Sequence, residues 1–168
     1  MKNLMKLVSV FALFILVGLS ACKKDEPQAA TCEGGSFTVT INSAAVTDVV
    51  LYNTLLKGND AKRMDIRATD ANGRQVIITF TDLSTGSSGN GVTTDAYIPF
   101  EEVTTGTENT FLFTIIEGGN SYSFINGSLD ITSCDANAKK VSGTFSFSDE
   151  DFEVTNGSFT NVCYTVLQ

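Results

Sequence analysis

The side chains that could do acid–base chemistry in this sequence are carboxylates. The chain has 19 acidic residues and no histidine. The absence of histidine excludes Ser-His-Asp and Cys-His nucleophilic sites. A glycosidase needs only two carboxylates at a fixed spacing, so a carboxylate-based glycan hydrolase stays open. The densest acidic groups, Glu101-Glu102 and Asp149-Glu150-Asp151, fall at expected turns, where solvated carboxylates are the simpler interpretation.

The acidic residues and the cysteines give little support for a metal-binding site. The acidic run from Asp149 to Glu153 could bind calcium weakly, but it lacks the spacing and the glycine of a dedicated calcium loop. The cysteines form no CxxC element, and without histidine they do not complete a zinc site. We therefore expect no catalytic residue, no metal and no cofactor, and we predict that the protein is not an enzyme.

Cys22 differs from the other cysteines because it directly follows an apolar N-terminal run. Lys2 and Lys6 are followed by an apolar run that ends in Leu19-Ser20-Ala21-Cys22. The run is too short for a membrane span, which needs about 20 residues, and it fits the apolar region of a signal peptide. The order leucine, small, small, cysteine resembles the lipobox of bacterial lipoproteins. This resemblance implies that residues 1–21 are removed and that the Cys22 thiol carries a lipid anchor.

The residues after Cys22 give information about the cellular location of the anchored protein. Residues 22–35 have the composition of a flexible polar tether. Lys24-Asp25-Glu26 within it resembles the export signal of Bacteroidota lipoproteins on the outer face of the outer membrane. The resemblance implies an outer-membrane protein that is exposed on the cell surface. A periplasm-facing anchor is the alternative.

Charge and length limit the partners and the number of domains. Removal of residues 1–21 takes away two lysines and no acid, which leaves nine basic and nineteen acidic residues and a net charge of −10. Such a surface repels phosphate backbones, so we expect no nucleic-acid partner. Residues 36–168 have the usual size of one domain. We expect the membrane to be reached only through the lipid on Cys22.

Three cysteines remain once Cys22 is lipidated, and outside the cytoplasm a disulfide can persist. Cys134 and Cys163 are expected at the same end of the sheet with one strand between them. A bridge therefore requires the loop over residues 135–140 to swing away. We predict a Cys134–Cys163 disulfide; a bridge from Cys32 to either of them, or no bridge, are the alternatives.

Alternation of apolar and polar residues dominates the chain and predicts β-strands. A first strand is expected over residues 36–42, and the run over residues 49–52 suits a buried strand. Ala71-Asn72-Gly73 fits a hairpin loop in which paired residue numbers sum to 144. This register makes three apolar pairs on one face: Met64 with Phe80, Ile66 with Ile78, and Ala68 with Val76.

The last third of the chain repeats a glycine–hydroxyl–apolar pattern, at residues 127–129, 143–145 and 157–159. Folding the first two copies predicts paired numbers that sum to 272, which sets Gly127 opposite Phe145. Folding the next two predicts a sum of 302, which sets Gly157 opposite Phe145. An aromatic ring would then cover each glycine. The parity of Val154 requires a bulge near Asn156-Gly157. A hairpin turn at Asn126-Gly127 is the competing interpretation.

The polar segment over residues 83–94 is the expected ligand loop, because long surface loops in compact domains often carry function. Its candidate contacts are Ser84, Gly86, Ser87, Ser88, Gly89, Asn90 and Gly91. Pro99 then restricts a short strand over residues 95–100 to a sheet edge or a bulge. Another strand is expected from Phe111 to Ile115. Glycan-binding modules often stack sugars on aromatic rings, but the four tyrosines are more simply part of a buried second face: Tyr52, Tyr97, Tyr122 and Tyr164.

Two segments carry a family resemblance. The opening strand Phe37-Thr38-Val39-Thr40-Ile41-Asn42 and the closing hairpin, with Gly143-Thr144-Phe145-Ser146-Phe147 and Thr155-Asn156-Gly157-Ser158-Phe159, resemble a family of small Bacteroidota outer-membrane lipoproteins of unknown function. The similarity covers residues 36–162. Val39 and Ser43 stand where that family tends to have alanine and glycine. The resemblance implies a fold and a cellular address and no catalytic residues.

Together these patterns predict an antiparallel all-β domain of about nine strands, mostly a meander, folded as a β-sandwich or flattened barrel. The predicted function is a lipid-anchored, surface-exposed, non-enzymatic binding module for a glycan or a protein. A lipocalin-like carrier of a small apolar ligand is the first alternative, and the hydrolase is the second. An enclosed apolar cavity would favour the carrier. Two carboxylates that face each other across a cleft would favour the hydrolase. A filled core with an exposed loop over residues 83–94 would favour the binding module.

Overall fold

Twelve strands and one short 3-10 helix form the domain in the computed structural model, which describes residues 35–46, 49–84, 89–102 and 106–168. The prediction of an all-β domain is confirmed. The elements are β1 (Ser36–Ile41), β2 (Ala44–Val46), β3 (Val50–Lys57), β4 (Lys62–Thr69), β5 (Gln75–Asp82), β6 (Ala96–Pro99), η1 (Phe100–Glu102), β7 (Thr110–Glu117), β8 (Asn120–Phe124), β9 (Ser128–Asp135), β10 (Lys140–Ser148), β11 (Glu153–Cys163) and β12 (Thr165–Leu167).

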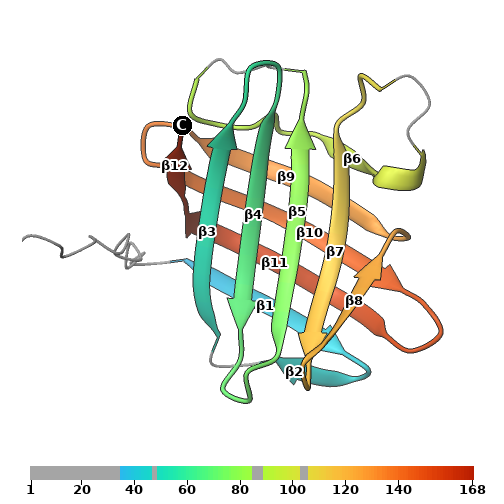
Figure 1. The fold of residues 1–168 in the computed structure, drawn as a ribbon. Helices are drawn as coiled ribbons and strands as arrows, with labels where there is room; N and C mark the ends of the chain where they lie inside the picture. The colour runs from blue at the N-terminus through green and yellow to red at the C-terminus, as the bar shows by residue number, and fades with distance from the viewer. Residues whose placement is uncertain (1–34, 47–48, 85–88, 103–105) are drawn as a thin grey trace, which may run out of the picture.

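The strands form two layers that face each other (Figure 1). The front layer consists of β3, β4, β5 and β7, and the rear layer of β9, β10, β11 and β1 crosses behind it obliquely. The continuous strand order is β12-β3-β4-β5-β7-β6-β9-β10-β11-β1-β2, and β8 pairs with β7. Consecutive strands pair in most places, as a meander requires. Two pairings, β12 with β3 and β6 with β7, are parallel, so the sheet is mixed where a wholly antiparallel one was expected.

The short strand β6 joins the two layers. Its first half pairs with β9, where Tyr97 lies opposite Leu129, and its second half pairs with β7, where Pro99 lies opposite Phe111. Pro99 was expected at a sheet edge or a bulge, yet β6 lies inside the strand order. The position tolerates proline because Pro99 is the last residue of the strand, and Ile98 donates the backbone hydrogen bond to Asn109 instead.

Phenylalanine rings fill the space between the layers. Phe113 of β7 stacks on Phe147 of β10 with ring centroids 4.5 Å apart, and it also contacts Phe145 at 5.6 Å. Phe37 extends this row from β1, at 5.5 Å from Phe145, and Phe124 extends it from β8, at 4.6 Å from Phe147. All five rings are buried. Their contacts connect both layers through one apolar core.

Two of the predicted registers are confirmed. Met64 pairs with Phe80, Ile66 with Ile78 and Ala68 with Val76, as the sum of 144 requires. Gly143 pairs with Phe159 and Gly157 with Phe145, as the sum of 302 requires. The register then shifts by one residue between Phe145 and Phe147, where Asn156 has a φ of 53°, so the predicted bulge is confirmed as well.

The register predicted between residues 125–131 and β10 is wrong by two residues. Phe145 pairs with Leu129, and Gly143 pairs with Ile131. The reason is that the chain changes layers at residues 125–127: Phe124 still pairs with Phe113 in the front layer, and β9 begins only at Ser128 in the rear layer. The competing hairpin at Asn126-Gly127 is also wrong, because the strands on either side of it have different neighbours.

The strand predicted over residues 49–52 exists only in part and is not buried. Strand β3 begins at Val50, which is 72% exposed, and Tyr52 is also exposed. The residues that face the core are Leu51, Asn53 and Leu55. Within the described residues, no helix has the length and apolarity needed to cross a membrane.

We predict that Gly157→Ala destabilises the full-length protein by about 1–3 kcal/mol, the usual cost of overpacking a core. An added Cβ would lie 2.6 Å from the Phe145 ring. Urea denaturation measures the effect, and Thr160→Ser on the outer side of the same strand is the control, with an expected change within about 0.5 kcal/mol. Strictly additive effects of Gly157→Ala and Phe145→Leu would contradict direct ring-on-glycine packing.

Candidate functional site

The predicted ligand loop begins and ends on a buried polar cluster. Gly86, Ser87 and Ser88 lie outside the described residues, whereas Ser84, Gly89, Asn90 and Gly91 are described. Asp82, the last residue of β5, is fully buried. One oxygen of its carboxylate accepts hydrogen bonds from the Ser84 amide at 3.0 Å and the Ser84 hydroxyl at 2.8 Å. The other accepts from the Thr93 amide at 2.8 Å, so a single carboxylate holds both ends of the loop.

A buried lysine lies beside this carboxylate. Lys62 is the Cα partner of Asp82 across β4 and β5 and is only 2% exposed. Its Nζ donates a hydrogen bond to the Gly91 carbonyl at 2.5 Å. Burial lowers the pKa of the Lys62 ammonium, and the negative charge of Asp82 opposes that shift. The two opposite charges and the loop backbone therefore stabilise one another in a site from which water is largely excluded.

A tyrosine and a thiol complete the cluster. The Tyr164 hydroxyl donates to the Asn90 carbonyl at 2.5 Å, and the Val92 amide donates to Cys134 Sγ at 3.4 Å. Burial raises the pKa of Tyr164, since the phenolate is the charged form. A Cβ on Gly91 would lie 3.0 Å from Cys134 Sγ, so the loop backbone passes directly over the thiol. The backbone groups of residues 90–92 are thus bonded to the protein's own side chains.

The predicted Cys134–Cys163 disulfide is wrong. Cys134 is a free, half-buried thiol, and Cys163 is disulfide-bonded, so the two do not bridge each other. The geometry explains why the predicted bridge does not form. Strand β10 lies between the two cysteines, since Val141 pairs with Cys134 on one side and with Val162 on the other. The pairing continues to Lys140, so the loop after β9 does not swing away.

The outer surface of the rear layer is lined by hydroxyl side chains, and we call it the hydroxyl face. Its serine and threonine residues lie between the core residues of the four strands: Ser36, Thr38 and Thr40 of β1; Ser128 and Ser133 of β9; Ser142, Thr144 and Ser146 of β10; Thr155, Ser158 and Thr160 of β11. The register aligns Thr38, Ser158 and Thr144 in one row across three strands. Thr38 and Ser158 share a hydrogen bond of 2.7 Å.

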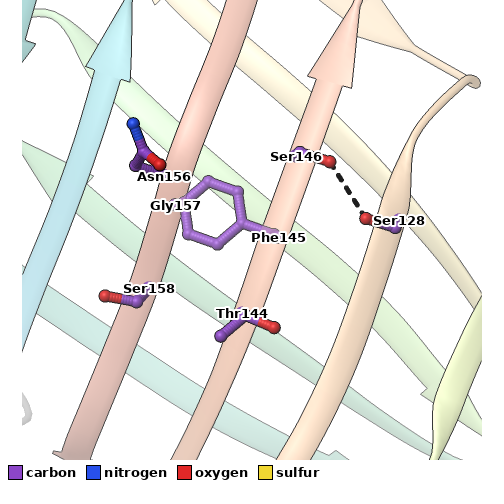
Figure 2. Close-up of a pocket in the computed structure, with 7 residues that line it drawn as sticks. All are labelled: Ser128, Thr144, Phe145, Ser146, Asn156, Gly157 and Ser158. Atoms are coloured by element: carbon purple, nitrogen blue, oxygen red, sulfur yellow. Dashed lines mark hydrogen bonds between the residues drawn. The ribbon is translucent and has the colours of Figure 1, made fainter.

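An open groove of ≈ 450 Å³ crosses this face over β9, β10 and β11. Figure 2 shows Thr144, Ser146 and Ser158 along it, and the hydroxyls of Ser128 and Ser146 share a hydrogen bond of 3.0 Å. The groove lies where Asn156 forms the bulge of β11. The same bulge that keeps Phe159 and Val154 on the core side therefore shapes the outer surface.

The other expected candidates lie apart from this groove. Asp149 Oδ1 accepts hydrogen bonds from the amides of Asp151 and Phe152, which makes the acidic run a turn. Glu101 and Glu102 are exposed in η1. No group of three acidic or cysteine side chains that could hold a metal occurs in the part of the chain that the structure describes.

The four tyrosines do not share a surface. Tyr97 and Tyr164 are buried, and Tyr122 packs on Phe152 with ring centroids 5.0 Å apart. Tyr52 is exposed on the front layer. Three of the four rings therefore belong to the interior, as the favoured interpretation of a buried second face expects.

Searches against protein-family models, curated proteins and solved structures found no match to this chain.

The buried cluster yields a prediction for stability. Asp82→Ala should destabilise the full-length protein by about 3–5 kcal/mol, because it leaves the buried Lys62 ammonium without its carboxylate and removes the acceptor for both ends of the loop. Chemical denaturation measures the loss. The matched control is Asp130→Ala on the exposed side of β9, with an expected change within about 0.5 kcal/mol. Equal effects of the two substitutions would show that Asp82 does not hold the loop.

Proposed function

We propose that this chain is a non-enzymatic binding module of the bacterial cell envelope, anchored through lipid on Cys22, and that it binds hydroxyl-rich glycans on its hydroxyl face. The observation that carries the proposal is the groove over β9, β10 and β11, lined by aligned serine and threonine side chains.

Hydroxyl groups suit a glycan because each one donates one hydrogen bond and accepts others, as sugar hydroxyls do. Serine and threonine also lose little side-chain entropy when they are held in place. Each hydrogen bond contributes only about 0.5–1.5 kcal/mol, so several aligned groups are needed for binding. The row of Thr38, Ser158 and Thr144 supplies such a repeat, and the spacing of strands places the next residue about 4.8 Å away.

The packing between the layers supports a surface site over the two alternatives. The carrier alternative requires room for an apolar ligand between the layers, where the rings of Phe113, Phe145 and Phe147 are in mutual contact. The hydrolase alternative requires two facing carboxylates. The densest acidic run instead forms a turn in which Asp149 accepts hydrogen bonds from its own neighbours. A glycan-binding site on the hydroxyl face requires neither an internal cavity nor a pair of facing carboxylates.

We test glycan binding with the full-length lipoprotein in detergent on an array of bacterial and host glycans. The double variant Thr144→Val with Ser158→Ala should reduce the affinity for the bound glycan roughly tenfold, the loss expected for one to two hydrogen bonds. Thr54→Val on the front layer is the matched control and should leave affinity unchanged. Binding that survives the double variant and falls with the control would overturn the assignment of the hydroxyl face.

The cellular address is tested separately. On intact cells that make an epitope-tagged copy, added proteinase should remove the tag signal, because we place the domain on the outer surface. The Cys22→Ala variant is the control for anchoring and should be released from the membrane fraction. A signal that persists until the outer membrane is broken would contradict surface exposure and support the periplasm-facing alternative.

A further inference from the structure

The large hydrophobic side chains that the described residues expose are gathered on one side of the molecule. They are Val50, Tyr52, Leu56, Phe100 and Leu167. The exposure is substantial: Val50 is 72% exposed and Phe100 is 65% exposed. Large apolar side chains that are this exposed on one face are candidates for an interaction site.

Strand pairing places these residues on the outer side of the front layer. Val50, Tyr52 and Leu56 occupy alternate, outward positions of β3, and Leu167 of β12 is the Cα partner of Leu56. Phe100 lies at the far side of the layer. It lines a groove together with outward residues of β4, β5 and β7, namely Arg63, Thr79, Thr81, Thr110 and Leu112.

Two arginines lie between the apolar residues. Arg63 is the Cα partner of Leu56, and Arg67 is the Cα partner of Tyr52. Both are about half exposed, and both pair with Asp65, at 3.1 Å and 3.5 Å. Thr79 also donates to Asp65 at 2.9 Å, which fixes the carboxylate between the two guanidinium groups. The arginines are therefore held in place beside apolar side chains before any partner arrives.

We infer that this surface, which we call the arginine–aromatic face, docks a protein partner whose own surface combines carboxylates with apolar side chains. Aromatic residues and arginine are the types enriched in the centres of protein interfaces, and tyrosine and arginine are frequent hot spots. Arg63 and Arg67 together with Asp65 carry a net charge of +1 on a mature chain with a net charge of −10, so the face differs in charge from the molecule around it. Carboxylates on the partner would complement them.

Charge argues against a second copy of this chain as the occupant. A two-fold dimer through this face would bring Arg63 and Arg67 of one copy toward the same residues of the other. Like charges opposed across an interface are unfavourable. The inference is independent of glycan binding, because the hydroxyl face lies on the opposite layer.

The test is site-specific photo-crosslinking of the full-length lipoprotein in the cells that make it. A benzophenone amino acid replaces Tyr52 or Phe100 in two variants and Thr144 of the hydroxyl face in a control. We expect positions 52 and 100 to give an adduct with the same protein, and position 144 to give no adduct with that protein. The crosslinked peptide of the partner should contain acidic and apolar residues.

Charge reversal makes the test specific. Arg63→Glu with Arg67→Glu should lower the adduct yield at least about tenfold, since like charges across an interface cost more than the 1.4 kcal/mol that a tenfold change requires. Arg63→Lys with Arg67→Lys should retain most of it. The proposal is overturned by an adduct with a second copy of the chain or with lipid, by a yield that charge reversal does not change, or by no adduct from positions 52 and 100.

Discussion

The contact of aromatic rings between the two layers is the interaction on which the rest of the structure depends. Phe113 of the front layer lies against Phe145 and Phe147 of the rear layer, and these contacts determine how closely the layers approach. The ring of Phe145 is accommodated because Gly157, its partner on β11, has no side chain. The bulge at Asn156 then returns Val154 to the core side. The outer groove is a consequence of the same packing.

A second constraint acts where β4 begins and β5 ends, next to the loop. Lys62 and Asp82 continue the inward alternation of their strands, so both charged groups are directed into the domain. Burial of a charge is costly unless it is paired and hydrogen-bonded. The loop supplies those bonds through Ser84, Gly91 and Thr93. The structure of the loop ends and the burial of this charged pair therefore depend on each other.

Pairing between strands that are close in the sequence was predictable from the alternation of residues. The register of the β4–β5 hairpin was correct, and extending its sum of 144 by one further inward pair would have placed Lys62 opposite Asp82. Alternation alone does not indicate that buried pair, because lysine and aspartate are rarely buried unless they are paired. The register of β9 was wrong because a change of layer at residues 125–127 leaves no signal in the alternation. The predicted disulfide is wrong for a separate reason, since the intact strand β10 lies between Cys134 and Cys163.

Aromatic rings are in contact between the layers, and we propose that the two outer faces, one of hydroxyls and one of arginine and aromatic residues, carry the function in place of an internal cavity. Native mass spectrometry of the protein, extracted in mild detergent from the membranes of cells that make it, tests this proposal most directly. With the lipid anchor that we propose on Cys22, we predict the mass of the acylated chain and no other apolar molecule. Retention of a further apolar molecule of defined mass would contradict the claim and support a carrier.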